Sequence, residues 1–127
     1  MEYKKVKSFT DLVAWKEGHS LVIAVFKEIK DFPREVYFLK DQMGRCSVSI
    51  TSCIAEGFSR KSRKEKVQFY YMSLGSTTEL QNQLLIARDS GYISNETFKI
   101  LAEQTIRVHK LINGLIKSAE DLKILNT

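Results

Sequence analysis

The chain has 127 residues, enough for one domain with its own core, and 43% of them are hydrophobic, which is too many for a disordered chain. A single proline and six glycines leave few turns, which argues against a many-stranded sandwich or barrel and favours a few long helices. The 20 Lys and Arg residues exceed the 15 Asp and Glu residues by five, so the protein is basic.

The first half of the chain carries two stretches with the 3,4 spacing of an amphipathic helix. The first spans about residues 10 to 30, and the second follows Pro33, which suits a helix start, and ends near Gly57. The predicted buried positions are Leu12, Trp15, His19, Val22, Phe26 and Ile29 in the first helix, and Val36, Leu39, Met43, Cys46, Ile50 and Cys53 in the second.

The second half of the chain carries two more stretches with this helical spacing. The third helix is expected to begin at Ser62, which forms a capping box with Glu65, and to end at Gly91 in a left-handed conformation. The fourth begins near Ser94. The predicted buried positions are Val67, Tyr71, Leu74, Thr78, Gln81 and Leu85, widened by Tyr70, Leu84 and Ile86, in the third helix, and Phe98, Leu101, Thr105, Val108, Ile112, Leu115, Ala119 and Leu122 in the fourth.

Four helices of this length with short connections predict an all-α fold, an antiparallel up-and-down four-helix bundle over residues 9–123. Residues 1–8 are expected to form a short basic N-terminal arm and residues 124–127 a C-terminal tail. Each helix also holds an interior glycine, which is either neutral or marks a close backbone approach. Apolar residues outside the predicted buried positions suggest a subunit interface: Ile23, Ile86, Ile106 and Ile116.

The residue types that form metal and catalytic sites in other proteins, such as His and Cys, show no active-site pattern in this sequence. The Glu-x-x-His pair of di-iron bundles is absent, and His19 is expected to be a hydrogen-bonded core residue. Cys46 and Cys53 lie seven residues apart on one helix, about 10 Å along its axis, so they are too far apart to form a disulfide, and they lack zinc-site spacing. We therefore expect two reduced, buried cysteines, no catalytic residues, no metal and no cofactor.

Missing sequence motifs exclude further classes of protein. There is no nucleophile elbow, P-loop or dinucleotide-binding glycine pattern. The absence of a leader pattern or a long uncharged apolar run predicts a cytoplasmic protein that does not enter a membrane. A polar group interrupts the third helix, for which a buried hydrogen-bond network or a subunit contact is the expected role: Thr77, Thr78, Glu79 and Gln81.

The positive charge is concentrated between residues 58 and 66, which carry a net charge of +4. These cations are positioned to neutralise phosphates, and the neighbouring Phe58, Phe69 and Tyr70 to stack on unpaired bases. The alternative is a solvated helix start, although cations in a first turn oppose the helix dipole. The candidate nucleic-acid-binding residues are Arg60, Lys61, Arg63, Lys64 and Lys66.

Several motifs resemble the small bacterial four-helix-bundle proteins encoded in intervening sequences of 23S ribosomal RNA genes. The resemblance covers residues 9 to 117 and departs from the usual pattern at Thr51, where proline is common, and at Cys53, where asparagine is frequent. The motifs that carry it are Phe32-Pro33-Arg34-Glu35, Gln42-Met43-Gly44-Arg45-Cys46-Ser47-Val48-Ser49-Ile50, Ile54-Ala55-Glu56-Gly57-Phe58, Leu74-Gly75-Ser76, Glu79-Leu80, Gln83-Leu84 and Gly91-Tyr92-Ile93, with Leu12 and Trp15 in the opening helix.

The resemblance implies an up-and-down bundle that assembles as a homopentamer and has no known catalytic activity. It also implies kinship with the accessory variability determinant of diversity-generating retroelements, a basic pentamer that binds nucleic acid and a reverse transcriptase. We therefore expect a non-enzymatic homo-oligomer that binds RNA, or alternatively DNA, through the basic loop. The alternative function is a scaffold that recruits a partner protein without contacting nucleic acid.

Overall fold

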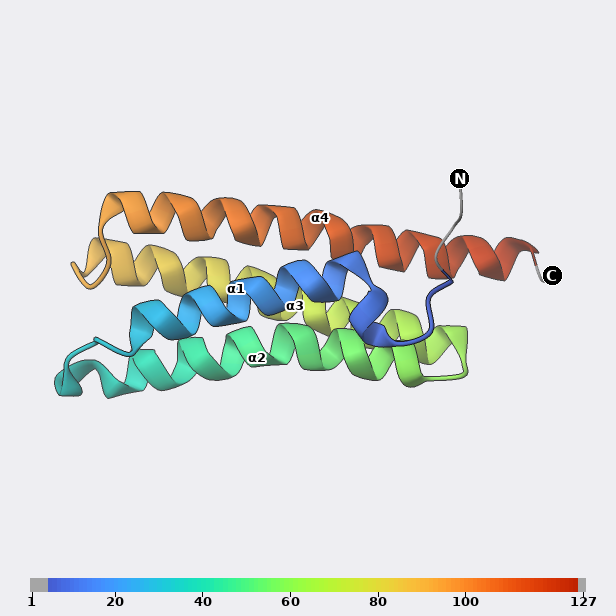
Figure 1. Cartoon of the computed structure of the whole chain (residues 1–127), viewed down its shortest axis with the longest axis horizontal. Helices are drawn as coiled ribbons and strands as arrows, with labels where there is room; N and C mark the ends of the chain where they lie inside the picture. The colour runs from blue at the N-terminus through green and yellow to red at the C-terminus, as the bar shows by residue number, and fades with distance from the viewer. Residues whose placement is uncertain (1–4, 126–127) are drawn as a thin grey trace.

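The computed structural model describes residues 5–125, with side chains through residue 121. Four helices account for most of it: α1 (Val13–Ile29), α2 (Tyr37–Ser59), α3 (Arg63–Asp89) and α4 (Asn95–Leu125). They run antiparallel along one long axis (Figure 1), and each helix packs against the two beside it, so that α1 contacts α2 and α4, and α3 contacts the same two. The predicted all-α four-helix bundle is confirmed.

Local sequence explains where the helices start. Ser8 opens a short 3-10 helix, Phe9–Asp11, through a capping box with Asp11, and α1 follows it. After Pro33 the chain forms a second 3-10 helix, Arg34–Val36, before α2. α4 continues to Leu125, into the segment that was expected to be a tail. Residues 1–4 of the expected arm and residues 126–127 lie outside the described residues.

The turn between α3 and α4 is a Schellman motif. Gly91 has φ +84°, as predicted, and this left-handed residue lets the chain reverse. The Tyr92 N–H donates to the Ala87 carbonyl at 2.8 Å, and the Gly91 N–H donates to the Arg88 carbonyl at 3.0 Å. These two bonds satisfy carbonyl groups that the end of α3 would otherwise leave unpaired.

The buried faces of α2 and α4 agree with the prediction from Met43 through Cys53, from Leu101 through Ile112 and at Ala119, whereas Leu115 is half-buried and the side chain of Leu122 lies outside the described residues. The buried face of α1 is rotated. Its buried residues include Ala14, Gly18, Leu21 and Val25, whereas His19 and Phe26, predicted to be buried, are exposed. Small residues allow the rotated face to approach α2 closely, since a Cβ added at Gly18 would lie 3.1 Å from Thr51 Cγ2. Ile116 also differs from the prediction, because it belongs to the core and not to an exposed face.

The predicted buried face of α3 is wrong except at Tyr70 and Leu84, because polar residues occupy much of the true one. Its buried positions are Tyr70, Ser73, Thr77, Leu80, Gln83, Leu84 and Ala87. The Ser73 hydroxyl donates to the Ile50 carbonyl of α2 at 2.7 Å, and the Thr77 hydroxyl donates to the Ser73 carbonyl at 2.9 Å. Gln81 Nε2 lies 3.2 Å from Thr105 Oγ1 of α4. Hydrogen bonding compensates the burial of these groups, so a search for apolar periodicity misses them.

Candidate nucleic-acid interface

The basic residues form the connection between α2 and α3. α2 ends at Ser59, Arg60 takes an extended conformation, and Ser62 caps α3 by accepting a 3.3 Å hydrogen bond from the Glu65 N–H. The predicted helix start is therefore confirmed, with the Ser62 half of the capping box in place. Figure 1 shows this turn at the same end of the bundle as the N-terminal segment and the end of α4.

Two of the five candidate cations are held by the protein itself. The Lys66 ammonium donates to the Phe58 carbonyl at 2.6 Å and to the Gly57 carbonyl at 3.4 Å, and burial lowers the pKa of Lys66. It thereby caps the C-terminus of α2, where a cation also suits the helix dipole. The Arg60 guanidinium pairs with Glu56 at 3.4 Å and lies 4.7 Å above the centre of the Phe69 ring.

Lys61 and Lys64 are exposed and form no ion pair with any described residue. Arg63 is half-buried, and its Nη1 atom is buried without a hydrogen-bond partner. These three side chains line a hollow of about 500 Å³, and Glu120 of α4 lines it from the other side. Lys61, Arg63 and Lys64 are thus the cations of the turn that remain free to meet an anion.

The aromatic side chains beside the turn do not offer free stacking surfaces. Tyr70 is 4% exposed and packs against Gly57, while Phe58 and Phe69 are half-buried beneath the Lys66 and Arg60 cations. The expectation that they stack on bases is therefore not supported, because burial and cation–π contacts already occupy them. The N-terminal segment, which Figure 1 shows at the same end, carries the exposed lysines Lys5 and Lys7 and therefore adds positive charge there.

The two cysteines of α2 lie in the protein interior. Cys46 and Cys53 are buried and unpaired, as predicted. The Cys46 thiol lies 3.0 Å from the Ser76 carbonyl oxygen and 3.7 Å from a Glu79 carboxylate oxygen, and burial, assisted by Glu79, raises its pKa to about 12. Within the described residues, no group of three or more His, Cys, Asp or Glu side chains is placed to hold a metal ion.

His19 does not lie in the core, contrary to the prediction. It is exposed and stacks on Trp15, with the ring centres 4.7 Å apart and the planes 16° apart. The polar group predicted in α3 divides in two. Gln81 hydrogen-bonds to Thr105 of α4 and the buried Thr77 hydroxyl donates to the Ser73 carbonyl within α3, whereas Thr78 and Glu79 are exposed. None of the described helices is long and apolar enough to cross a membrane.

Comparisons with known proteins find a matching protein family and a solved structure of similar fold. Residues 10–114 match the model of the family described as 23S rRNA-intervening sequence protein. A crystal structure of a protein of unknown function from the S23 ribosomal protein family of Bacteroides thetaiotaomicron is 20% identical and superposes with a TM-score of 0.77, covering 83% of this chain and 96% of that one. Among curated proteins, none matches the sequence. At this identity the structural match shows the shared bundle fold.

Proposed function

This chain belongs to the 23S rRNA-intervening sequence protein family, and from that premise we propose that it is a non-enzymatic, cytoplasmic homo-oligomer that binds nucleic acid through the turn between α2 and α3. The preference for RNA over DNA rests on the family description. The observation that carries the proposal is the set of three unpaired cations at one end of the bundle, Lys61, Arg63 and Lys64. Such a cluster neutralises phosphates and releases their counterions.

The placement of the cations indicates how they recognise their ligand. Lysine and arginine side chains on an exposed turn contact phosphates and not base edges, so binding has little sequence specificity. With the aromatic rings covered, the described part of the turn contributes charge and no stacking surface. The affinity of one protomer is accordingly modest and depends strongly on salt.

Assembly multiplies that modest affinity. A ring, expected to be a pentamer from the resemblance, needs two different faces on each protomer, and exposed apolar side chains such as Ile23, Leu85, Ile86 and Ile106 supply surface for such contacts. Because the basic turn lies at one end of the long axis, a ring of parallel protomers presents all its turns on one rim. A single polyanion spanning several turns then binds with avidity.

The test is a matched pair of charge-reversal variants. Lys61→Glu with Lys64→Glu reverses the two exposed cations of the turn, and Lys27→Glu with Lys99→Glu makes the same change in net charge at exposed positions on α1 and α4. Binding of a labelled single-stranded RNA is measured by fluorescence anisotropy over a salt series. We expect the parent to show a log–log salt slope of about 0.7 per neutralised phosphate. The turn variant should bind at least about tenfold more weakly, while the control binds like the parent.

Two results would contradict the proposal. One is equal weakening in both variants, which would show that only net charge matters. The other is a parent protein that binds neither RNA nor DNA at low salt; in that case the turn is merely solvated, and a protein-interaction scaffold is the better account.

A further inference from the structure

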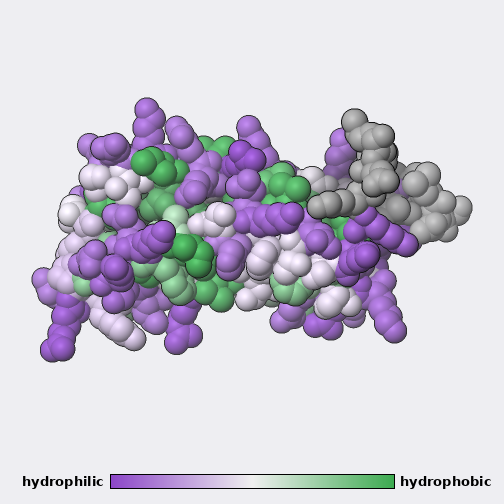
Figure 2. Space-filling view, in the orientation of Figure 1, coloured by the Kyte–Doolittle hydropathy of each residue, from purple (hydrophilic) through white to green (hydrophobic). Residues whose placement is uncertain are grey.

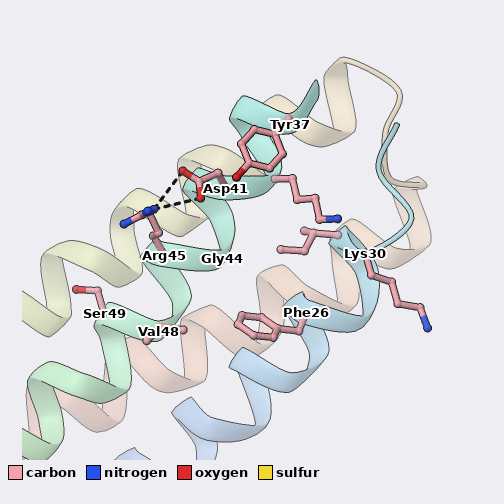
Figure 3. A pocket seen from close by; sticks show the side chains of 10 residues that line it. Phe26, Lys30, Tyr37, Asp41, Gly44, Arg45, Val48 and Ser49 are labelled. Atoms are coloured by element: carbon pink, nitrogen blue, oxygen red, sulfur yellow. Dashed lines mark hydrogen bonds and ion pairs between the residues drawn. The ribbon is translucent and has the colours of Figure 1, made fainter. Parts of the chain in front are cut away.

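A groove with an apolar floor runs between the C-terminal half of α1 and the N-terminal half of α2, with a volume of about 690 Å³. Phe26 of α1 and Val48 of α2 point toward one another across one end of it, and Tyr37 stands at the other end (Figure 3). These three side chains are 45%, 41% and 65% exposed, respectively. On the face shown in Figure 2, apolar patches of this kind are separated by hydrophilic side chains.

Gly44 keeps the groove open. It lies on α2 between Tyr37 and Val48, and a Cβ added there would lie 3.5 Å from Ile29 Cδ1 and 4.0 Å from Phe26 Cε1, which is ordinary contact distance. A larger side chain at this position would therefore project into the space between the helices. The lining positions on α2 run from Tyr37 to Ser49, about 18 Å of helix, or the length of three to four turns of a second helix.

The rim of the groove is positively charged. Lys30, Lys40 and Arg45 line it, and Asp41 is the one carboxylate among the lining residues. Asp41 is engaged by Arg45, whose Nε lies 3.1 Å from both carboxylate oxygens (Figure 3). The two lysines are left to face an incoming partner, so the charge complementary to this groove is negative.

We propose that this groove binds an amphipathic helix of another protein, with apolar residues spaced i, i+3 or i+4, and i+7 for the floor and Asp or Glu residues beside them for the rim. Charge complementarity favours such a helix over a second copy of this chain. The exposed apolar residues of α3 and α4 lie between residues 71 and 110, a segment with four cations and four carboxylates, so it offers no net negative charge to the rim.

The test starts from a displayed library of helical peptides with randomised surface positions, selected against the full chain. We expect the enriched peptides to be acidic and to share the apolar spacing. A labelled enriched peptide should lose at least about tenfold in affinity for Val48→Glu, because a carboxylate is placed in the apolar floor. It should bind Ile100→Glu like the parent, since that matched variant alters an exposed apolar residue on α4, outside the groove.

Charge reversal supplies a second readout. Lys30→Glu with Lys40→Glu should reduce binding of the acidic peptide and favour a version with lysines in place of its acidic residues, whereas Lys61→Glu with Lys64→Glu should leave peptide binding unchanged. Failure to enrich any peptide, enrichment of basic peptides, or equal binding to Val48→Glu and the parent would overturn the proposal. A drop in oligomer mass for Val48→Glu would also overturn it, by making the groove a contact between copies of the chain.

Discussion

The Lys66 ammonium lies 2.6 Å from the Phe58 carbonyl oxygen, so a side chain at the start of α3 closes the end of α2. The same ammonium lies 5.4 Å from the centre of the Phe58 ring and 3.4 Å from the Gly57 carbonyl oxygen. Lys66 therefore belongs to the structure of the turn, and it differs in this respect from Lys61 and Lys64, which extend into solvent. Five cations that look equivalent in the sequence have separate roles.

This division predicts that replacing Lys66 mainly lowers the stability of the protein, whereas replacing Lys64 mainly lowers its affinity for RNA. Lys66→Met removes the hydrogen bonds to the end of α2 and should lower the free energy of unfolding by about 1 kcal/mol. Lys64→Met should change it by less than about 0.5 kcal/mol, because the side chain is exposed and unpaired. Urea denaturation gives the two stabilities. RNA anisotropy should show the larger loss of affinity for Lys64→Met, and the reverse order in either measurement would contradict the assignment.

A second pair of variants tests the contact between α2 and α3. A Cβ at Gly57 would lie 2.7 Å from Tyr70 Cε1, so Gly57→Ala forces the ring or the helix to move and should destabilise the protein by about 2 kcal/mol. Gly75→Ala is the matched control. It has no atom within 4 Å of the added Cβ, and alanine is favoured over glycine in a helix by about 1 kcal/mol. Thermal unfolding should place the two melting temperatures on opposite sides of the parent's.

The ends of the helices could be predicted from the sequence, whereas the buried faces of two helices could not. The end of the second helix, the cap at Ser62 and the left-handed Gly91 follow from local chemistry, and the structure has all three close to their expected positions. The faces of α1 and α3 do not follow from local chemistry. Gly18 and Ser73 are buried because neighbouring helices approach them closely or accept their hydrogen bonds, and a search for apolar periodicity favours the bulkier exposed residues instead.

The same limit applies to the candidate site. The sequence located the basic turn and its charge, which need only the order of residues. It could not separate the capping role of Lys66 from the exposure of Lys61, because that depends on how the start of α3 packs against the end of α2. The apolar groove escaped the sequence for a related reason: Phe26 was assigned to the core, whereas the rotation of α1 places it on the groove.

The proposed assembly predicts a solution mass of five times the 14.6 kDa chain mass. Light scattering at micromolar concentration measures it directly. Leu85→Glu together with Ile86→Glu places two charges on an exposed apolar part of α3 and should reduce the mass if this part is a subunit contact, while the helical circular dichroism stays unchanged. A parent mass near 14.6 kDa would exclude the ring.

The last prediction concerns the pH dependence of stability set by Cys46. Its pKa is raised from 9.0 to about 12 in the folded protein, so above pH 9 the unfolded chain loses a proton that the native thiol keeps. The unfolded state then binds fewer protons, and the free energy of unfolding falls as the pH rises.

The contribution of Cys46 is fully present below pH 9 and is lost progressively as the pH rises from 9 toward 12. Between pH 8 and pH 10 the parent should lose about 1 kcal/mol more stability than Cys46→Ala, measured by urea denaturation at each pH. The comparison with Cys46→Ala cancels the titration of Lys66 and Tyr70, whose pKa values burial lowers and raises, respectively. Identical pH profiles for parent and variant, or rapid labelling of the Cys46 thiol in the native protein at pH 8, would show that this thiol is not held protonated by the fold.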